Sequence, residues 1–281
     1  PTHPAIERLT APPSAPRNRR RSIPAVAGEW IKAAGFRSPN IRGKVALGDS
    51  AGMRPRLIGR LGLADLITVV NGMLGFAAAV AATVDPGLAA RMILLASMGD
   101  GLDGVVARHY GATPVGKYLD SLADVAAFGV APGLLVVGVA RTQWGVSLAA
   151  LTPRLAIAVA LPATFLGAVV IRLGFYTAEQ SDDPVTLGVP STLAATILAA
   201  AVLAKAGTPE LFVAAAGIFT ILMVTQIPYP DLLARDTLIM GTVQGLTVII
   251  PTALGRAFPY ALLTLGLAYL VLGPKFYWRK V

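Results

Sequence analysis

The chain has 281 residues, of which 55% are hydrophobic and only 14% are charged. About a quarter of the residues are charged in ordinary soluble domains, so this composition excludes that class and indicates an integral membrane protein. The absence of cysteine from the sequence excludes disulfides, thiolate zinc sites and a cysteine nucleophile.

The first 60 residues differ from the rest in charge. Residues 1–60 contain 12 Lys and Arg against 3 Asp and Glu, whereas residues 61–281 contain 12 of each kind. We expect a partly disordered region with a possible interfacial helix between residues 29 and 60. A basic stretch beside a membrane helix favours the cytoplasmic side, so we interpret it as a topology determinant and expect no nucleic-acid partner.

From residue 61 onward, apolar stretches of about 20 residues recur, and each is long enough to cross a hydrocarbon core about 30 Å thick. They lack the two-residue alternation of barrel strands, so residues 61–281 are predicted to be one all-α transmembrane domain. The predicted segments lie near 62–84, 88–109, 114–140, 149–172, 189–206, 208–227, 236–255 and 257–274.

Four aspartates lie within the second and third predicted segments. Asp100 and Asp103 are one turn apart, and so are Asp120 and Asp124, so each pair shares a helix face. The connection around residues 111–114 is short, which makes the two helices antiparallel neighbours. The four carboxylates are therefore predicted to converge on one pocket.

Four carboxylates in a medium of low dielectric repel one another, and burying them in a membrane costs on the order of 10 kcal/mol on insertion scales. Hard divalent cations with oxygen ligands relieve this repulsion, and two such ions are suited to displacement at phosphorus. Gly104 and Ala107 leave room for a nucleotide or diphosphate beside the helix, and Arg108 is placed to pair with a phosphate oxygen.

The pattern Asp100-x2-Asp103-Gly104-x2-Ala107-Arg108, followed by Gly116-x3-Asp120-x3-Asp124, resembles the signature of the CDP-alcohol phosphotransferase family. The spacer between Arg108 and Gly116 has seven residues, one fewer than is usual in the family, and the difference falls in the predicted loop.

The resemblance implies a six-helix core, here with about two extra transmembrane helices, a homodimer, and a cytoplasm-facing cavity that holds two divalent cations, Mg2+ or Mn2+. It also implies roles for the signature residues. The metal ligands would be Asp100, Asp103, Asp120 and Asp124, with Asp124 also the catalytic base, and the CDP-lipid would be held by Gly104, Ala107, Arg108 and Gly116.

Two polar residues of the first predicted segment extend this set. Thr68 and Asn71 lie about one turn apart and are candidates for nucleotide contacts. Hydrogen bonding between helices is an equally good explanation for both.

Two stretches resemble membrane-embedded phosphatidylserine and archaetidylserine synthases and favour L-serine as acceptor. Phe128-Gly129-Val130-Ala131-Pro132 follows the last aspartate, and Gly188-Val189-Pro190-Ser191 follows the fourth segment. Arg172 matches the first arginine of an Arg-Leu-Ala-Arg-Phe stretch, whereas Phe175 replaces the second. Arg172 and Ser191 are therefore the candidate acceptor-binding residues.

The predicted reaction transfers a phosphatidyl-type group from a CDP-activated lipid, CDP-diacylglycerol or CDP-archaeol, to L-serine and releases CMP. Glycerol phosphate or an inositol phosphate as acceptor is the first alternative, which the small number of Lys and Arg in the relevant loops disfavours. A cation transporter that uses the acidic cluster is the second, and it would favour broken helices and internal symmetry.

Overall fold

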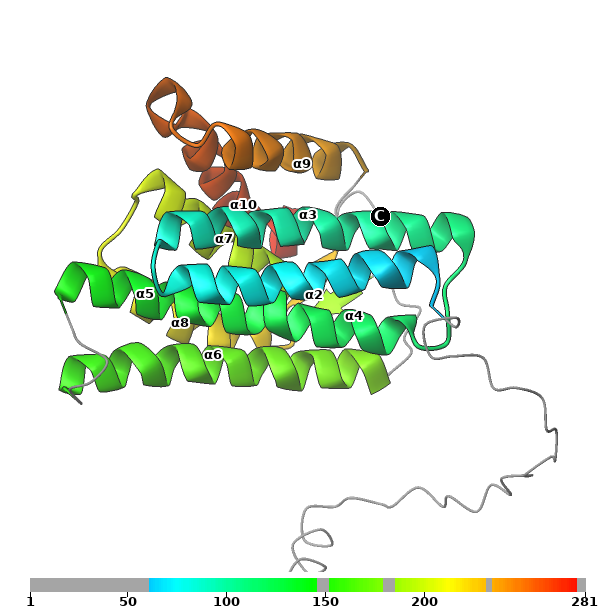
Figure 1. Cartoon of the computed structure of the whole chain (residues 1–281), viewed down its shortest axis with the longest axis horizontal. Helices are drawn as coiled ribbons and strands as arrows, with labels where there is room; N and C mark the ends of the chain where they lie inside the picture. Colours follow the sequence, from blue (N-terminus) through cyan, green and yellow to red (C-terminus); the bar gives the residue numbers. More distant parts are fainter. Residues whose placement is uncertain (1–60, 146–151, 179–184, 231–233, 277–281) are drawn as a thin grey trace, which may run out of the picture. The chain divides into compact units, whose positions relative to one another are not determined.

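The computed structural model describes residues 61–145, 152–178, 185–230 and 234–276. The basic region before residue 61, with the interfacial helix predicted there, lies outside these ranges. The described residues are almost entirely helical (Figure 1). The helices are α2 Leu63–Ala82, α3 Pro86–Tyr110, α4 Gly116–Asp124, α5 Ala131–Trp144, α6 Pro153–Ala178, α7 Ser191–Ala204, α8 Pro209–Met223, α9 Ala234–Ile249 and α10 Ala257–Phe276.

The third predicted segment forms one continuous helical rod in which α4 and α5 are joined by a π-helical turn, η2 (Val125–Val130). Pro132 follows this turn, and a proline has no N–H to donate and clashes with the carbonyl four residues earlier in an α-helix. The wider turn relieves that conflict, because its bonds reach back five residues, as from Ala131 N–H to the Ala126 carbonyl.

Four described helical stretches have the length and apolar composition needed to span a membrane: residues 63–82, 116–144, 153–178 and 253–275. α3 is 25 residues long, but Arg91, Asp100 and Asp103 make it more polar than these four. α7 and α8 have only 14 and 15 residues, about 21–23 Å at 1.5 Å per residue, and are shorter than predicted.

α7 and α8 are short because extended segments flank them. β1 (Val185–Leu187) pairs antiparallel with β2 (Pro228–Pro230), so the chain before α7 and after α8 is extended. The Gly188 N–H donates to the Ile227 carbonyl at 2.8 Å, and Gly188 has a φ of +73°. A β-carbon at this glycine would overlap the Met223 carbonyl oxygen, which accounts for the residue type on packing grounds.

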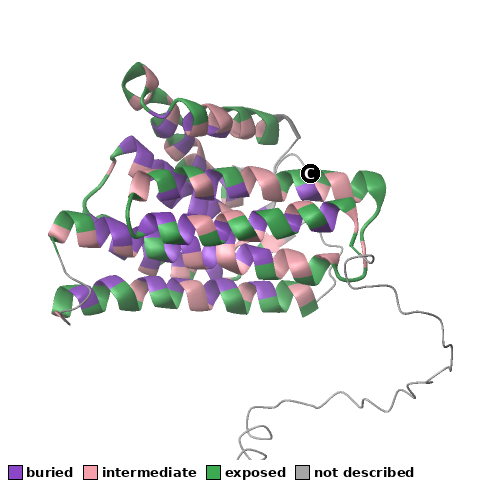
Figure 2. Ribbon diagram, in the orientation of Figure 1, coloured by how far each residue is buried: buried purple, intermediate pink, exposed green. Residues whose placement is uncertain are grey.

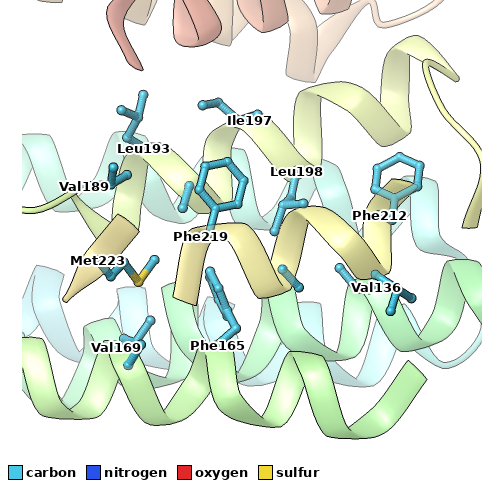
Figure 3. Close-up of a cluster of buried hydrophobic side chains, with 14 of the residues drawn as sticks. Val136, Phe165, Val169, Val189, Leu193, Ile197, Leu198, Phe212, Phe219 and Met223 are labelled. Atoms are coloured by element: carbon cyan, nitrogen blue, oxygen red, sulfur yellow. The ribbon is translucent and has the colours of Figure 1, made fainter. Parts of the chain in front are cut away.

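Two apolar clusters hold the helices together. One joins α5, α6, α7 and α8 around Phe165, Phe212 and Phe219 (Figure 3). The other joins α2, α3 and α7 largely through alanines, which permit close helix approach. Exposed and buried residues alternate around each long helix in Figure 2, and many exposed side chains are large and apolar, as expected for surfaces that face lipid.

The last two helices attach to the rest through α3, α7 and β2. α10 packs against α7, and α9 packs against α3 and α10. Gln244 on α9 is buried and donates from Nε2 to the Leu94 carbonyl on α3 at 2.8 Å. The predicted architecture of a six-helix core with two additional helices is therefore confirmed for the described part of the chain.

Candidate active site

The four predicted aspartates come from the C-terminal half of α3 and from α4. Tyr110 ends α3, Gly111 follows it with a φ of +94°, and α4 begins at Gly116. This short connection returns the chain antiparallel to α3. Asp100 and Asp103 therefore lie on a helix turn close to that of Asp120.

The structure brings three of the carboxylates into one cluster. Oxygen atoms of Asp100, Asp103 and Asp120 all lie within 4.8 Å of one another. Asp103 is buried, and the other two are half-buried. This is a suitable donor set for a divalent cation, because Mg2+ and Mn2+ prefer carboxylate oxygens and a cation offsets the mutual repulsion of the acids.

Asp124 is the fourth member and differs from the other three. Its side chain is 8% exposed, and its Oδ1 has no hydrogen-bond partner. Its carboxyl lies beside that of Asp100 and within electrostatic range of Asp103 and Asp120. A buried carboxylate oxygen without a partner is costly, so this atom is available to a bound group.

Thr68 reaches the cluster from α2. Its hydroxyl donates to Asp103 Oδ2 at 2.7 Å and is also 3.1 Å from the Ala64 carbonyl. Of the two interpretations of Thr68, this geometry is that of a hydrogen bond between helices. The contact fixes the Asp103 carboxylate in one orientation.

Asn71, one turn further along α2, is buried, yet neither polar atom of its amide has a partner. The amide lies over Gly99, since a β-carbon there would be 3.4 Å from Asn71 Oδ1. A buried amide with both its donor and its acceptor unused retains the capacity to bind a ligand.

Gly104, Ala107 and Arg108 lie beyond the acids on α3. Gly104 and Ala107 are half-buried, and Arg108 is exposed. A β-carbon at Gly104 would be 3.6 Å from Arg108 Nη1, so the guanidinium is folded back over this glycine. The three residues thus form one small surface next to Asp103.

Asp65 is a residue that the sequence analysis missed. It is buried near the start of α2, where its Oδ2 accepts from the Gly62 N–H at 2.8 Å and from the Thr113 hydroxyl at 2.7 Å. A β-carbon at Gly116 would lie 2.9 Å from its Oδ1, so packing against Asp65 explains this glycine of the signature. The signal in the sequence was a lone acid in the apolar stretch that begins at Leu61.

Arg172 on α6 faces the acidic cluster. Its guanidinium stacks over the Tyr176 ring at 4.6 Å, its Nε is buried without a hydrogen-bond partner, and Asp124 is within electrostatic range. The Tyr176 hydroxyl accepts from the Leu187 N–H at 2.6 Å and is 3.2 Å from the Leu187 carbonyl. Tyr176, also missed from sequence, therefore connects Arg172 to the segment that leads into α7.

Three further residues lie on α4, α6 and α7. The hydroxyls of Ser121 and Thr177 share a short hydrogen bond that joins α4 to α6 and so holds the helix of Arg172 beside that of Asp124. Ser191 is buried at the first position of α7. Among the hydrogen bonds described for the resolved ranges, none joins the Ser191 hydroxyl to the four aspartates.

Curated relatives share parts of this sequence. The chain is 35% identical over 142 residues to a CDP-diacylglycerol–serine O-phosphatidyltransferase of Helicobacter pylori, and the match covers 47% of this chain and 56% of the relative. It is 40% identical over 85 residues to the archaetidylserine synthase of Methanothermobacter thermautotrophicus, covering 28% and 36%. It is 33% identical over 132 residues to a CDP-diacylglycerol–serine O-phosphatidyltransferase of Bacillus subtilis, covering 47% and 68%.

The chain thus spans little more than half the length of the Helicobacter relative. A family model covers more of it, since the model of CDP-alcohol phosphatidyltransferases matches residues 61–227, which contain α2 to α8 and all of the site residues above. α9 and α10 lie beyond this match. On this evidence the chain belongs to the CDP-alcohol phosphatidyltransferase family, whose members are integral membrane proteins.

Proposed function

We propose that the protein transfers a phosphatidyl-type group from a CDP-activated lipid to L-serine and releases CMP. Family membership and the names of the relatives support the reaction class. The observation that carries the choice of serine is the Arg172 guanidinium, which is half-buried and has an unpaired Nε near Asp124. A guanidinium near a carboxylate suits a small alcohol that also carries a carboxylate, because the cation can bind that group while the acid faces the hydroxyl.

The donor would be held along α3. Gly104 and Ala107 leave the helix surface open to the diphosphate and cytidine, Arg108 pairs with a phosphate oxygen, and the free amide of Asn71 is suited to the base or ribose. Two divalent cations, when bound by Asp100, Asp103, Asp120 and Asp124, would neutralise the diphosphate and the charge that develops on CMP. Thr68 keeps Asp103 oriented for this role.

The acceptor would lie between α4 and α6. Arg172 binds the serine carboxylate, and the serine hydroxyl then points toward Asp124, whose free Oδ1 accepts its proton. As the serine oxygen bonds to the lipid-bearing phosphorus, the bond from that phosphorus to the CMP oxygen breaks. Phe175 stands at the position of the synthases' second arginine and carries no charge, so Arg172 is the cation assigned to the serine carboxylate.

The remaining predictions form part of the same proposal. The basic block in residues 1–60 places that end, and with it the α3–α4 connection and the acidic cluster, on the cytoplasmic side. Residues 61–281 act as the catalytic domain, and two copies associate as a homodimer. Ser191 is a further candidate acceptor contact. The segment before it is held by the bond from the Gly188 N–H, and it includes Leu187, which bonds to Tyr176.

The test is CMP release by the purified full chain with CDP-diacylglycerol and Mg2+ or Mn2+. L-serine, glycerol 3-phosphate and inositol 1-phosphate are compared as acceptors, and CDP-archaeol is used as a second donor. Serine-dependent CMP release that is lost in Asp100→Ala is the expected result. Release that depends on a phosphorylated acceptor would overturn the assignment of serine but keep the reaction class.

A matched control separates site effects from general effects of lost charge. Arg154 lies on α6 with Arg172 but is exposed near the far end of that helix. Arg154→Gln is expected to retain CMP release. Silence of the wild-type protein with every donor and acceptor would contradict the transferase and favour the cation transporter.

A further inference from the structure

A cavity lies at the end of the helical bundle opposite the acidic cluster. It has a volume of about 580 Å³ and is formed where the α2–α3, α7–α8 and α9–α10 turns meet the last turns of α5. Arg91, which lines it, is nine residues before Asp100 on α3, or about 14 Å along the helix axis. In Figure 1 the α2–α3 turn and the α3–α4 connection lie at opposite ends of α3.

Three cations line this cavity, and each comes from a different junction. Arg91 belongs to the first turns of α3, Lys205 caps the C-terminus of α7, and Arg256 precedes α10. The acid in the lining, Asp85, uses Oδ1 to accept from the Gly87 and Leu88 N–H groups at 2.8 and 3.2 Å, as the N-cap of α3. The lining therefore carries a net positive charge.

Two of the cations occupy strained backbone positions. Lys205 has a φ of +53° and Arg256 a φ of +70°, and Leu254 and Gly255 before Arg256 are also left-handed. Such conformations cost on the order of 1 kcal/mol or more for a residue with a side chain and persist only where the surroundings enforce them. At Arg256, Nη1 donates to the Leu203 carbonyl at 2.7 Å, and within the described ranges no second hydrogen bond of this guanidinium is seen.

Apolar side chains form the deeper wall of the same cavity. Val139, Leu203 and Phe212 are buried, whereas the polar residues at its rim, such as Thr142 and Gln143, are exposed. A rim of cations over apolar walls at the end of membrane helices matches a headgroup phosphate with the upper part of its acyl chains. A free phosphate ion would leave the apolar wall without a partner.

We propose that this cavity binds an anionic phospholipid through its headgroup phosphate, with Arg91, Lys205 and Arg256 as the phosphate-binding residues. The site is separate from the acidic cluster and does not depend on the proposed transferase reaction. Arg256, Pro251 and Thr252 come from the α9–α10 pair, which lies outside the family match. Completing this lipid site is therefore a role for the two additional helices.

The test measures binding of labelled phosphatidylglycerol to the full chain in phosphatidylcholine nanodiscs, without CDP-lipid or serine. Lys205→Gln and Arg256→Gln should each weaken binding about fivefold, as expected for loss of one cation near an anionic lipid. Arg154→Gln removes a cation outside the cavity lining and should leave binding unchanged. Lys205→Arg keeps the charge and should also bind normally.

A second type of variant guards against misfolding. Gln143→Trp keeps all three cations but places a large ring at the exposed rim, and it should lower binding while the thermal unfolding midpoint in phosphatidylcholine alone stays at the wild-type value. Unchanged binding in folded Arg256→Gln and Lys205→Gln would overturn the proposal, as would equal loss in Arg154→Gln. Inorganic phosphate that competes fully with the labelled lipid would show that the occupant is a soluble phosphate and not a lipid.

Discussion

The acidic cluster on the C-terminal half of α3 and the cavity at its N-terminal end are lined by side chains of opposite charge. At the C-terminal end, Asp100 and Asp103 join Asp120 within 4.8 Å, and their repulsion calls for bound cations. At the N-terminal end, cations surround a cavity, and two of them are held by strained turns. The difference indicates that one helix can serve two sites for groups of opposite charge, since the acids suit divalent cations and the basic lining suits the anionic headgroup proposed for it.

The largest expected effect belongs to Asp124→Asn at the acidic end. Loss of a general base lowers turnover by a factor of about 10² to 10⁴, whereas CDP-lipid binding should be largely retained because three metal-binding carboxylates remain. CMP release and direct binding of CDP-diacylglycerol are measured on the same preparation. Equal loss of binding and turnover would contradict a separate role for Asp124 as the base.

Arg172→Gln should have the next largest effect on activity. Hydrogen bonds to charged groups contribute about 1.5–3 kcal/mol, so KM for serine should rise about 10- to 100-fold with kcat less affected. The CDP-lipid KM should not change. A fall in kcat at an unchanged serine KM would instead place Arg172 in the chemical step.

Gly138→Ala probes packing near the basic end and should lower stability more than activity. A β-carbon there would overlap the Ala82 carbonyl oxygen at the α2–α3 turn, and overpacking costs about 1–3 kcal/mol. The matched control is Gly167→Ala on α6, where a β-carbon meets nothing within 4 Å. Thermal unfolding in nanodiscs should separate the two variants, and equal midpoints would refute the close approach of α5 to this turn.

Tyr176→Phe should have the smallest effect and sharpens the account of Arg172. The ring remains for stacking, but the hydroxyl bonds to Leu187 are lost, so KM for serine should rise only a few-fold, as expected for about 1 kcal/mol. Steady-state kinetics at varied serine concentration measure this change. An effect as large as that of Arg172→Gln would mean that the hydroxyl itself contacts the acceptor.

The helical segments and the acidic cluster could be predicted from the sequence because both depend on local spacing. The eight helical segments were predicted from apolar runs of membrane-spanning length, and the convergence of Asp100, Asp103 and Asp120 from their one-turn spacing and a short connection. These features need only helix geometry and chain length. They do not depend on contacts between distant segments.

The features that were missed depend on such distant contacts. Besides its local bond from the Gly62 N–H, Asp65 contacts Thr113 and Gly116, some 50 residues later. Besides its stacking with Arg172, Tyr176 bonds to Leu187 in a segment that is extended and not helical. The early end of α8 likewise reflects the pairing of β2 with β1. A single sequence carries no periodicity that indicates these partners. The basic cavity, assembled from three turns and the end of α5, could not be predicted for the same reason.

The π-helical turn at residues 125–130 has a consequence for the angular phase of the rod that contains Asp120 and Asp124. One residue in an α-helix corresponds to a rotation of about 100°, and a π turn accommodates one extra residue. The extra residue rotates Asp120 and Asp124 about the helix axis relative to the face of α5 that packs against its neighbours. Deleting one residue here would restore the ordinary helical phase and rotate the carboxylates away from α3. The π turn thus sets the direction of the acids separately from the packing of α5.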